Sequence, residues 1–420
     1  FHAASRGADD EVDIRLFDCR NRLLHHSKGR FTSTSIDCGK PTTRQEGNRF
    51  NGDPTCTKDT YGGFSDLRRQ PICHAARKVG ILPDTHPASK LHGHNFTART
   101  RVLLDDEWVK TRGNEVNDLQ VELKKAVEPF DYSYLNEIIS IPTDENLSRS
   151  IIKNISLKSI ESLGVASTRN QGADLESSSK VHVWKRFQFD AAHQLPNVHS
   201  GHKCGRMHGH GFEVVLHAIQ DIKDKDMGVD FDYLEEIWKP LKSELHHKCL
   251  NDIKGLENPT SEMLSTWIWN RLKPNFEQLS WVTVYETVTA GCHYDGEHYR
   301  IWKEQRFESA LSLNENKKDS LHGHSYLIRL HLSCPLDEVM GWTMDYGDVK
   351  EIFKPTLSQL DHYYLNEVEG IKDVSLPGLT GWIKGKLESE LSALDRIDLF
   401  ESPFVGVAHT WGEKGPALPV

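Results

Sequence analysis

His208 and His210, separated by one glycine, are the residues of this chain whose types and spacing most directly suggest chemistry. Successive side chains of a β-strand point to opposite faces, so this spacing places both imidazoles on one face. A third histidine, His193, ends the upstream sequence Phe-Asp-Ala-Ala-His. Three neutral imidazoles that leave one position open are a usual way to hold a catalytic zinc. The alternative is that His208 and His210 are ordinary strand residues.

The His-Gly-His pattern recurs at a fixed interval. It begins at His92, His208 and His322, at separations of 116 (92 to 208) and 114 (208 to 322) residues. A Leu-Asn pair keeps the same interval, at 135–136, 250–251 and 365–366. A period this long is a whole small domain, so the sequence predicts three tandem homologous domains.

Composition agrees with such a plan and excludes several classes of protein. A chain of 420 residues with 37% hydrophobic and 27% charged residues is typical of soluble proteins of about three domains. It has no apolar run of about 20 residues and no secretory signal, so we expect no membrane association and a cytoplasmic location. The net charge of −10 argues against nucleic acid as a partner. The eight cysteines form no Cys-x-x-Cys pair, so neither a disulfide framework nor a thiolate zinc site is indicated.

The middle repeat shows which elements must position the histidines. Residues 181–189 alternate as a strand, the His-Gly-His strand follows, and residues 231–245 carry apolar residues at helical spacing, with Pro240 predicted to kink that helix. Thr260 can cap a second helix, and residues 281–287 alternate as a closing strand. Strands grouped apart from helices predict an α+β domain with an antiparallel sheet backed by helices.

The domain boundaries follow from the repeats and from composition. Residues 1–70 lack sustained periodicity and are predicted to be irregular or disordered, and the polar, serine-rich residues 168–179 are predicted to be a linker. The three repeats then occupy residues 71–167, 180–298 and 299–420.

Residues 180–297 resemble the 6-pyruvoyltetrahydropterin synthase and 6-carboxytetrahydropterin synthase family of tunnelling-fold proteins. Five separated motifs carry the resemblance in order: Phe-Asp-Ala-Ala-His193, Cys204 four residues before His208-Gly-His210, His247 before Leu250-Asn251, Pro259-Thr260-Ser261-Glu262, and Tyr285-Glu286-Thr287. The three residues between the cysteine and His-Gly-His are similar to the bacterial 6-carboxytetrahydropterin synthase of queuosine biosynthesis.

The resemblance implies a carbon–carbon lyase that converts 7,8-dihydroneopterin triphosphate to 6-carboxy-5,6,7,8-tetrahydropterin, acetaldehyde and triphosphate. The implied roles are Zn2+ binding by His193, His208 and His210, base catalysis by Cys204, acid/base catalysis by His247, and substrate binding by Glu286 and Thr287. A bound dication would act as a Lewis acid and would lower the pKa of the Cys204 thiol. Two alternatives stay open, a pyruvoyltetrahydropterin synthase and a non-catalytic assembly that binds pterin or metal.

The repeats depart from the family pattern at different positions. In repeat two, His246 stands where the family has an aspartate that orients the histidine. Repeat three keeps Asp361 and His362 but has Leu311, Lys318 and His409 for the first zinc ligand, the cysteine and the glutamate. Repeat one has Arg77, Ala88, Tyr132 and Ser167 for the zinc ligand, the cysteine, the histidine and the glutamate. Repeats one and three are therefore predicted to be unable to catalyse alone.

In the family that this chain resembles, each domain is a four-stranded antiparallel sheet with two helices, and three domains close a barrel with substrate bound between neighbours. A tandem triplicate could therefore form a pseudo-trimer within one chain, and two such chains a homodimer. We further hypothesise that Asp361 and His362 replace the incomplete pair of His246 and His247 across a repeat interface. The alternative is that Asp361 is a relic at a helix end.

Overall fold

The computed structural model describes residues 72–103, 115–156, 160–176, 180–222, 226–313, 320–402 and 405–412, together with the backbone of residues 11–15. Within these ranges the predicted α+β class and the three tandem domains are confirmed. Most of the N-terminal segment that was predicted to be irregular lies outside the described residues.

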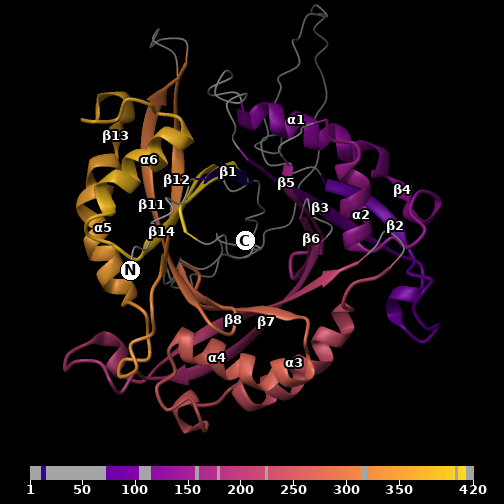
Figure 1. Cartoon of the computed structure of the whole chain (residues 1–420), viewed down its shortest axis with the longest axis horizontal. Coiled ribbons are helices and arrows are strands. Elements are labelled where there is room, and N and C mark those ends of the chain that lie inside the picture. The colour runs from indigo at the N-terminus through magenta and orange to yellow at the C-terminus, as the bar shows by residue number, and fades with distance from the viewer. Residues whose placement is uncertain are drawn as a thin grey trace, which may run out of the picture. The chain divides into compact units, whose positions relative to one another are not determined.

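The middle repeat consists of four antiparallel strands and two helices. The strands pair in the order β7 (Lys180–His193), β8 (His208–Asp221), β9 (Leu279–Thr287) and β10 (Ala290–Tyr294). The helices α3 (Phe231–Leu245) and α4 (Ser261–Leu272) lie together against one face of these strands (Figure 1). The predicted apolar stripe of α3 is the buried one, with Trp238 stacked on Phe187 of β7 at 5.1 Å between ring centroids.

The other two repeats contain the same order of elements. Repeat one contains β2 (Ile72–Arg77), β3 (His92–Leu103), α1 (Glu115–Val127), β4 (Ser133–Tyr134), α2 (Asp144–Ile152), β5 (Ile160–Thr168) and β6 (Gln171–Glu176). Repeat three contains β11 (Tyr299–Ser312), β12 (Leu321–Ser333), α5 (Tyr346–Leu360), β13 (Tyr363–Tyr364), α6 (Leu376–Leu387), β14 (Leu394–Ser402) and β15 (Val405–Thr410).

Strands of neighbouring repeats pair directly, so the described strands form one continuous sheet. β6 pairs with β7 and β10 pairs with β11, both antiparallel. Glu11–Arg15 form a further strand, β1, which pairs with β15 and with β3. The expectation of an irregular N-terminal segment is therefore wrong for these five residues.

The predicted linker at residues 168–179 is also wrong in its central part, because Gln171–Glu176 form β6. Gly172 explains why a chain of this composition pairs as a strand. A Cβ at this position would lie 2.7 Å from a ring carbon of Trp184 on β7, so only glycine allows the close approach. Gly291 of β10 packs against Trp302 of β11 in the same way. A glycine that packs against a tryptophan of the next strand thus recurs at residues 172 and 291, and it indicates a strand although residues 168–179 are polar.

Helix ends bring several site residues into place. The Thr260 hydroxyl accepts a hydrogen bond from the Met263 backbone N–H at 3.1 Å, which confirms the predicted cap of α4. Asp230 and Asp345 cap α3 and α5 in the same manner. None of the described helices is long and apolar enough to span a membrane.

Candidate metal and substrate site

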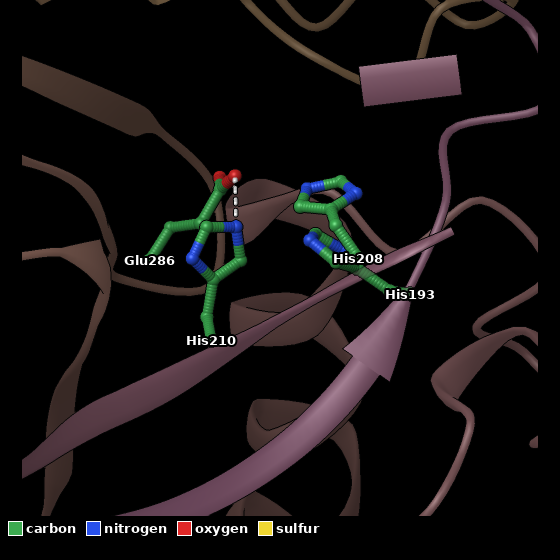
Figure 2. Close-up of side chains that lie close together, drawn as sticks. All are labelled: His193, His208, His210 and Glu286. Carbon is green, nitrogen blue, oxygen red and sulfur yellow. Dashed lines mark ion pairs between the residues drawn. The ribbon is translucent and has the colours of Figure 1, made fainter. Parts of the chain in front are cut away.

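The pairing of β7 with β8 gathers the three predicted zinc ligands. His193 lies directly opposite His208, and Ala191 lies opposite His210. Paired residues face the same side of a sheet, so all three imidazoles share one face. Their ring centroids are 4.5 Å (His193 to His208), 5.1 Å (His193 to His210) and 4.9 Å (His208 to His210) apart. Figure 2 shows the three rings grouped with the carboxylate of Glu286.

Hydrogen bonds fix which ring nitrogen faces the centre of this group. The Nδ1 atom of His193 donates to the Pro259 carbonyl at 3.0 Å, and Nδ1 of His208 donates to the Arg206 carbonyl at 2.7 Å. A carbonyl can only accept, so each hydrogen is on Nδ1 and the Nε2 lone pair is free. Among the described residues, Nε2 of His193 is buried without a hydrogen-bond partner. Such an atom requires an explanation, and metal ligation provides one.

The charge states also fit a metal. Burial, with the neighbouring imidazoles, lowers the pKa values of His193 and His210 to about 4, so both rings are neutral at pH 7. The Glu286 carboxylate lies 3.7 Å from Nε2 of His210. The ligand atoms of the three histidines and Glu286 all lie within 4.8 Å of one another. Imidazole and carboxylate ligands in a group of this size suit a divalent cation such as zinc.

The pKa of the Glu286 carboxyl group is shifted by burial and by neighbouring charges of both signs. Burial, with the charge of Glu262 next, raises its pKa to about 7, while the Lys303 ammonium acts in the opposite direction. Lys303 belongs to β11 of repeat three, so the site spans a repeat boundary. The ammonium groups of Lys303 and Lys203 lie close enough to influence each other, which makes them candidates to bind an anionic substrate.

Cys204 lies beside this group in a short 3-10 helix, Lys203–Gly205. The pKa of its thiol is raised, first by burial and then by the Glu286 carboxylate, with Lys203 opposing. The expected lowering therefore does not come from the side chains of the protein, because burial and the Glu286 carboxylate together outweigh Lys203. A bound dication would lower the pKa of this thiol.

His247 lies beside the edge of β7, where its backbone N–H donates to the Asp190 carbonyl at 2.7 Å. It lines an open hollow of about 590 Å³ together with Asp190, Gly209 and His210. The hollow adjoins the metal group, because His210 belongs to both. His247 adopts a left-handed conformation with φ of 57°, as do Tyr132 (52°) and His362 (62°) at the equivalent positions.

His246 takes over the hydrogen bond of the aspartate that it replaces. Its Nδ1 atom accepts from the Asp190 backbone N–H at 3.1 Å. In repeat one, the Asp131 carboxylate accepts equivalently from the His74 N–H at 2.8 Å. The histidine and the aspartate have thus changed places: repeat one has His74 on the strand and Asp131 after the helix, and repeat two has Asp190 on the strand and His246 after the helix. The negative charge is not absent from repeat two, because Asp190 carries it on the strand.

The hypothesis that Asp361 and His362 complete the site of Cys204 within one chain is not supported by their positions. Asp361 ends the 15-residue helix α5, which spans roughly 22 Å at about 1.5 Å per residue. Asp345, at the other end of α5, is the residue that contacts the Cys204 loop, through His202 at 3.0 Å. The Asp361 carboxylate instead accepts from the Glu308 N–H at 2.9 Å and lies 3.0 Å from Nδ1 of His362.

Thr287 does not point toward the histidines. It alternates with Glu286 along β9, so its side chain is on the opposite face. Its hydroxyl accepts from the Thr289 N–H at 3.3 Å and thereby stabilises the turn to β10.

In repeat one, the Arg77 guanidinium occupies the position that His193 has in repeat two. Arg77, at the position of His193, is buried and donates to the Pro142 carbonyl at 3.0 Å, as His193 does to Pro259. It also forms an ion pair with Asp144 at 2.7 Å. Burial and then the Arg77 charge lower the pKa of His94 to about 4. A guanidinium at this position excludes a metal dication by charge and by volume.

Repeat three lacks only part of the set. Leu311 replaces the first histidine and is buried. The expectation that His409 replaces the glutamate is wrong, because the equivalent residue is Glu401, whose carboxylate lies 3.9 Å from Nε2 of His324. Glu286 lies on β9, whose counterpart in repeat three is β14, whereas His409 lies on β15. Lys318, expected at the cysteine position, lies outside the described residues.

Sequence reasoning missed the residues that come from outside the motifs of repeat two. Lys303 and Asp345 belong to repeat three, and no local motif marks them. The only available signal was the family expectation that neighbouring domains share a site.

Comparison with known proteins agrees with this architecture. The family model described as 6-pyruvoyl tetrahydropterin synthase matches three times, at residues 69–176, 182–297 and 300–410. The chain belongs to this family. This member of the 6-pyruvoyl tetrahydropterin synthase family contains three copies of the domain, whereas each relative named below aligns with about one copy.

Two of the relatives are named as enzymes that act on pterins. The 6-carboxy-5,6,7,8-tetrahydropterin synthase of Synechocystis is 40% identical over 119 residues, which cover 27% of this chain and 91% of that protein. The dihydroneopterin monophosphate aldolase of Pyrococcus furiosus is 32% identical over 96 residues, covering 23% of this chain and 78% of that protein. Among solved structures, the 6-pyruvoyl tetrahydropterin synthase of Caenorhabditis elegans has 21% identity and a TM-score of 0.24, and the match covers 28% of this chain and 95% of that chain.

Proposed function

We propose that repeat two is a zinc-dependent 6-carboxy-5,6,7,8-tetrahydropterin synthase, a carbon–carbon lyase of queuosine biosynthesis. Its substrate would be 7,8-dihydroneopterin triphosphate, and its products 6-carboxytetrahydropterin, acetaldehyde and triphosphate. The observation that carries the proposal is the group of His193, His208 and His210, with the buried Nε2 atom of His193 free for ligation. The name of the Synechocystis relative supports this choice within the family.

The side chains of the site suit that reaction. Zinc on the three histidines would supply Lewis-acid chemistry to the side-chain hydroxyls of the substrate. The Cys204 thiolate would remove a proton from the neighbouring carbon. The Glu286 carboxylate would accept N–H bonds from the pterin ring, a bidentate interaction that carboxylates perform well. Lys203 and Lys303 would bind the triphosphate, because both ammonium groups act on the charges of this site.

The role of His247 as acid/base partner remains a proposal that the activity of a His247→Ala variant tests. A general acid/base group contributes about 10²–10⁴-fold to a rate. A rate within about twofold of the unmodified protein would exclude His247 from catalysis.

The central experiment measures products from 7,8-dihydroneopterin triphosphate with the zinc-loaded protein. Acetaldehyde release with Cys204→Ala inactive, at unchanged zinc content, is the expected result. A pyruvoyl pterin without acetaldehyde would favour the second candidate, a 6-pyruvoyltetrahydropterin synthase. Zinc binding without any turnover would favour a non-catalytic pterin- or metal-binding assembly.

The pairing pattern supports a pseudo-trimeric barrel within one chain. β1 pairs with β15 at one side and with β3 at the other, which would join the last repeat to the first. We further propose that two such chains form a homodimer through the residues that precede each His-Gly-His pattern. Leu91, Met207 and Leu321 are 68%, 53% and 60% exposed at these equivalent positions. Sedimentation of a Met207→Glu and Leu321→Glu double variant tests this, with a monomer expected.

A further inference from the structure

His202 connects the Cys204 loop to the neighbouring repeat. Its Nδ1 atom accepts a hydrogen bond from the Cys204 backbone N–H at 3.2 Å and so caps the 3-10 helix that carries the thiol. Because Nδ1 accepts, the hydrogen of a neutral ring is on Nε2. That Nε2 atom lies 3.0 Å from the Asp345 carboxylate of repeat three. Both side chains are mostly buried, with 15% and 16% of their surface exposed.

Asp345 is itself firmly held. It is the N-cap of α5, and the segment before it packs on repeat two by several hydrogen bonds. The Asn197 side-chain amide, in the loop that follows β7, donates to the Val339 carbonyl at 2.6 Å. The Glu262 carboxylate accepts from the Thr343 N–H at 2.8 Å. The start of α5 is thus fixed relative to both the Cys204 loop and the residues around Glu286.

Repeat one contains the same connection without a thiol. His86 accepts from the Ala88 N–H through Nδ1 at 3.1 Å, and its Nε2 atom lies 3.0 Å from Asp230 and 3.1 Å from Asp232 of repeat two. His86 therefore connects repeat one to the start of α3 in repeat two, as His202 connects repeat two to the start of α5. Ala88 stands where repeat two has Cys204, so the chain provides its own matched control.

We propose that His202 and Asp345 are positioning residues for Cys204, and that repeat three is needed for catalysis through this contact. Asp345 fixes the tautomer and orientation of His202, and His202 holds the backbone of Cys204 so that the thiol faces Glu286 and the histidines. The inference rests on the proposed role of Cys204 as the base.

Alanine variants of the two equivalent pairs test the proposal in the full chain. His202→Ala and Asp345→Ala are compared with His86→Ala and Asp230→Ala, which lose the same cap and the same kind of contact in repeat one. A misplacement of about 1 Å can cost about 10²-fold in rate. We expect kcat to fall by about that factor in the first pair, with KM and zinc content unchanged, and to stay within twofold in the second pair. Equal losses in both pairs would overturn the proposal.

Two conservative variants separate positioning from simple destabilisation. His202→Asn keeps an acceptor for the Cys204 N–H and a good capping residue but cannot reach Asp345, so it should be as slow as His202→Ala. Asp345→Asn keeps a cap and an acceptor for Nε2–H, so it should recover most of the rate. Full activity of His202→Asn would show that the contact between repeats is dispensable and would overturn the proposal.

Deuterium uptake of residues 199–207 provides a readout that does not depend on turnover. Faster exchange in His202→Ala and Asp345→Ala is expected, because the Cys204 amide loses its acceptor or that acceptor loses its anchor. Unchanged uptake in both variants would overturn the proposal. Faster uptake in a protein that does not convert dihydroneopterin triphosphate would support the positioning contact and reject the proposed function alone.

Discussion

One residue type decides which repeat can hold a metal. His-Gly-His is present in all three repeats, and in each the first histidine donates through Nδ1 to the carbonyl two residues earlier, at 2.7 Å. What differs is the residue opposite: His193 in repeat two, Arg77 in repeat one and Leu311 in repeat three. The His-Gly-His pattern alone therefore does not distinguish the repeats, and the residue opposite it on the partner strand does.

Metal content tests this at the level of single side chains. We expect one zinc per chain, and loss of about tenfold or more in occupancy for His193→Ala, because two imidazoles remain. His92→Ala and His322→Ala are the matched controls and should keep one zinc per chain. Elemental analysis after dialysis measures all of these. Two or more zinc ions per unmodified chain would contradict the assignment of repeats one and three as metal-free.

Glu286 predicts a pH dependence of stability in the metal-free protein. Its pKa is raised from 4.5 to about 7 in the folded state, first by burial and then by Glu262. The folded protein therefore binds more protons than the unfolded chain between these values, and stability falls as pH rises from about 4.5 to 7. The expected cost above pH 7 is roughly 1–3 kcal/mol. Glu286→Gln removes the ionisation, so the difference in melting temperature between variant and unmodified protein, measured in a chelator, should grow with pH. A difference independent of pH would contradict the raised pKa.

At the scale of elements, the prediction succeeded where periodicity was strong. The apolar spacing of residues 231–245 gave α3 with its observed bounds, and Thr260 marked the start of α4. It failed where packing overrides composition. Gln171–Glu176 pair as β6 because Gly172 fits against Trp184. Lys303 and Asp345 could not be found, since their position in the site depends on how two repeats dock.

One residue in the turn after the first helix of each repeat has a strained, left-handed backbone conformation. Tyr132, His247 and His362 have positive φ, which costs a residue with a side chain of order 1 kcal/mol relative to glycine. His362→Gly should therefore raise the melting temperature by a few degrees, because the strain is relieved and the His362 side chain is largely exposed. His362→Ala, which keeps the strain, is the control and should not stabilise. A lower melting temperature for the glycine variant would mean that the lost interaction between the His362 side chain and Asp361 stabilises the protein by more than the backbone strain destabilises it.

For the whole molecule, tandem fusion explains why the repeats could diverge. In a trimer of identical subunits, an arginine at the position of His193 would remove the metal from every site. In one chain, Arg77 removes only the site of repeat one, while its ion pair with Asp144 contributes a buried, hydrogen-bonded contact. Lys303 and Asp345 show that repeat three places side chains beside the candidate site of repeat two.

The proposed barrel predicts that the short strand β1 matters far more than its length suggests. Residues 11–15 pair with β15, and residues 13–15 also pair with β3. Ile14→Pro removes a backbone N–H donor of this strand and should lower the melting temperature by several degrees and promote self-association, because an uncovered edge pairs with other chains. Ile14→Val keeps the backbone donor and serves as the control. Light scattering during a thermal ramp measures both effects. If the proline variant melts and scatters like the valine variant, β1 does not join the last repeat to the first, and the closed barrel must be abandoned.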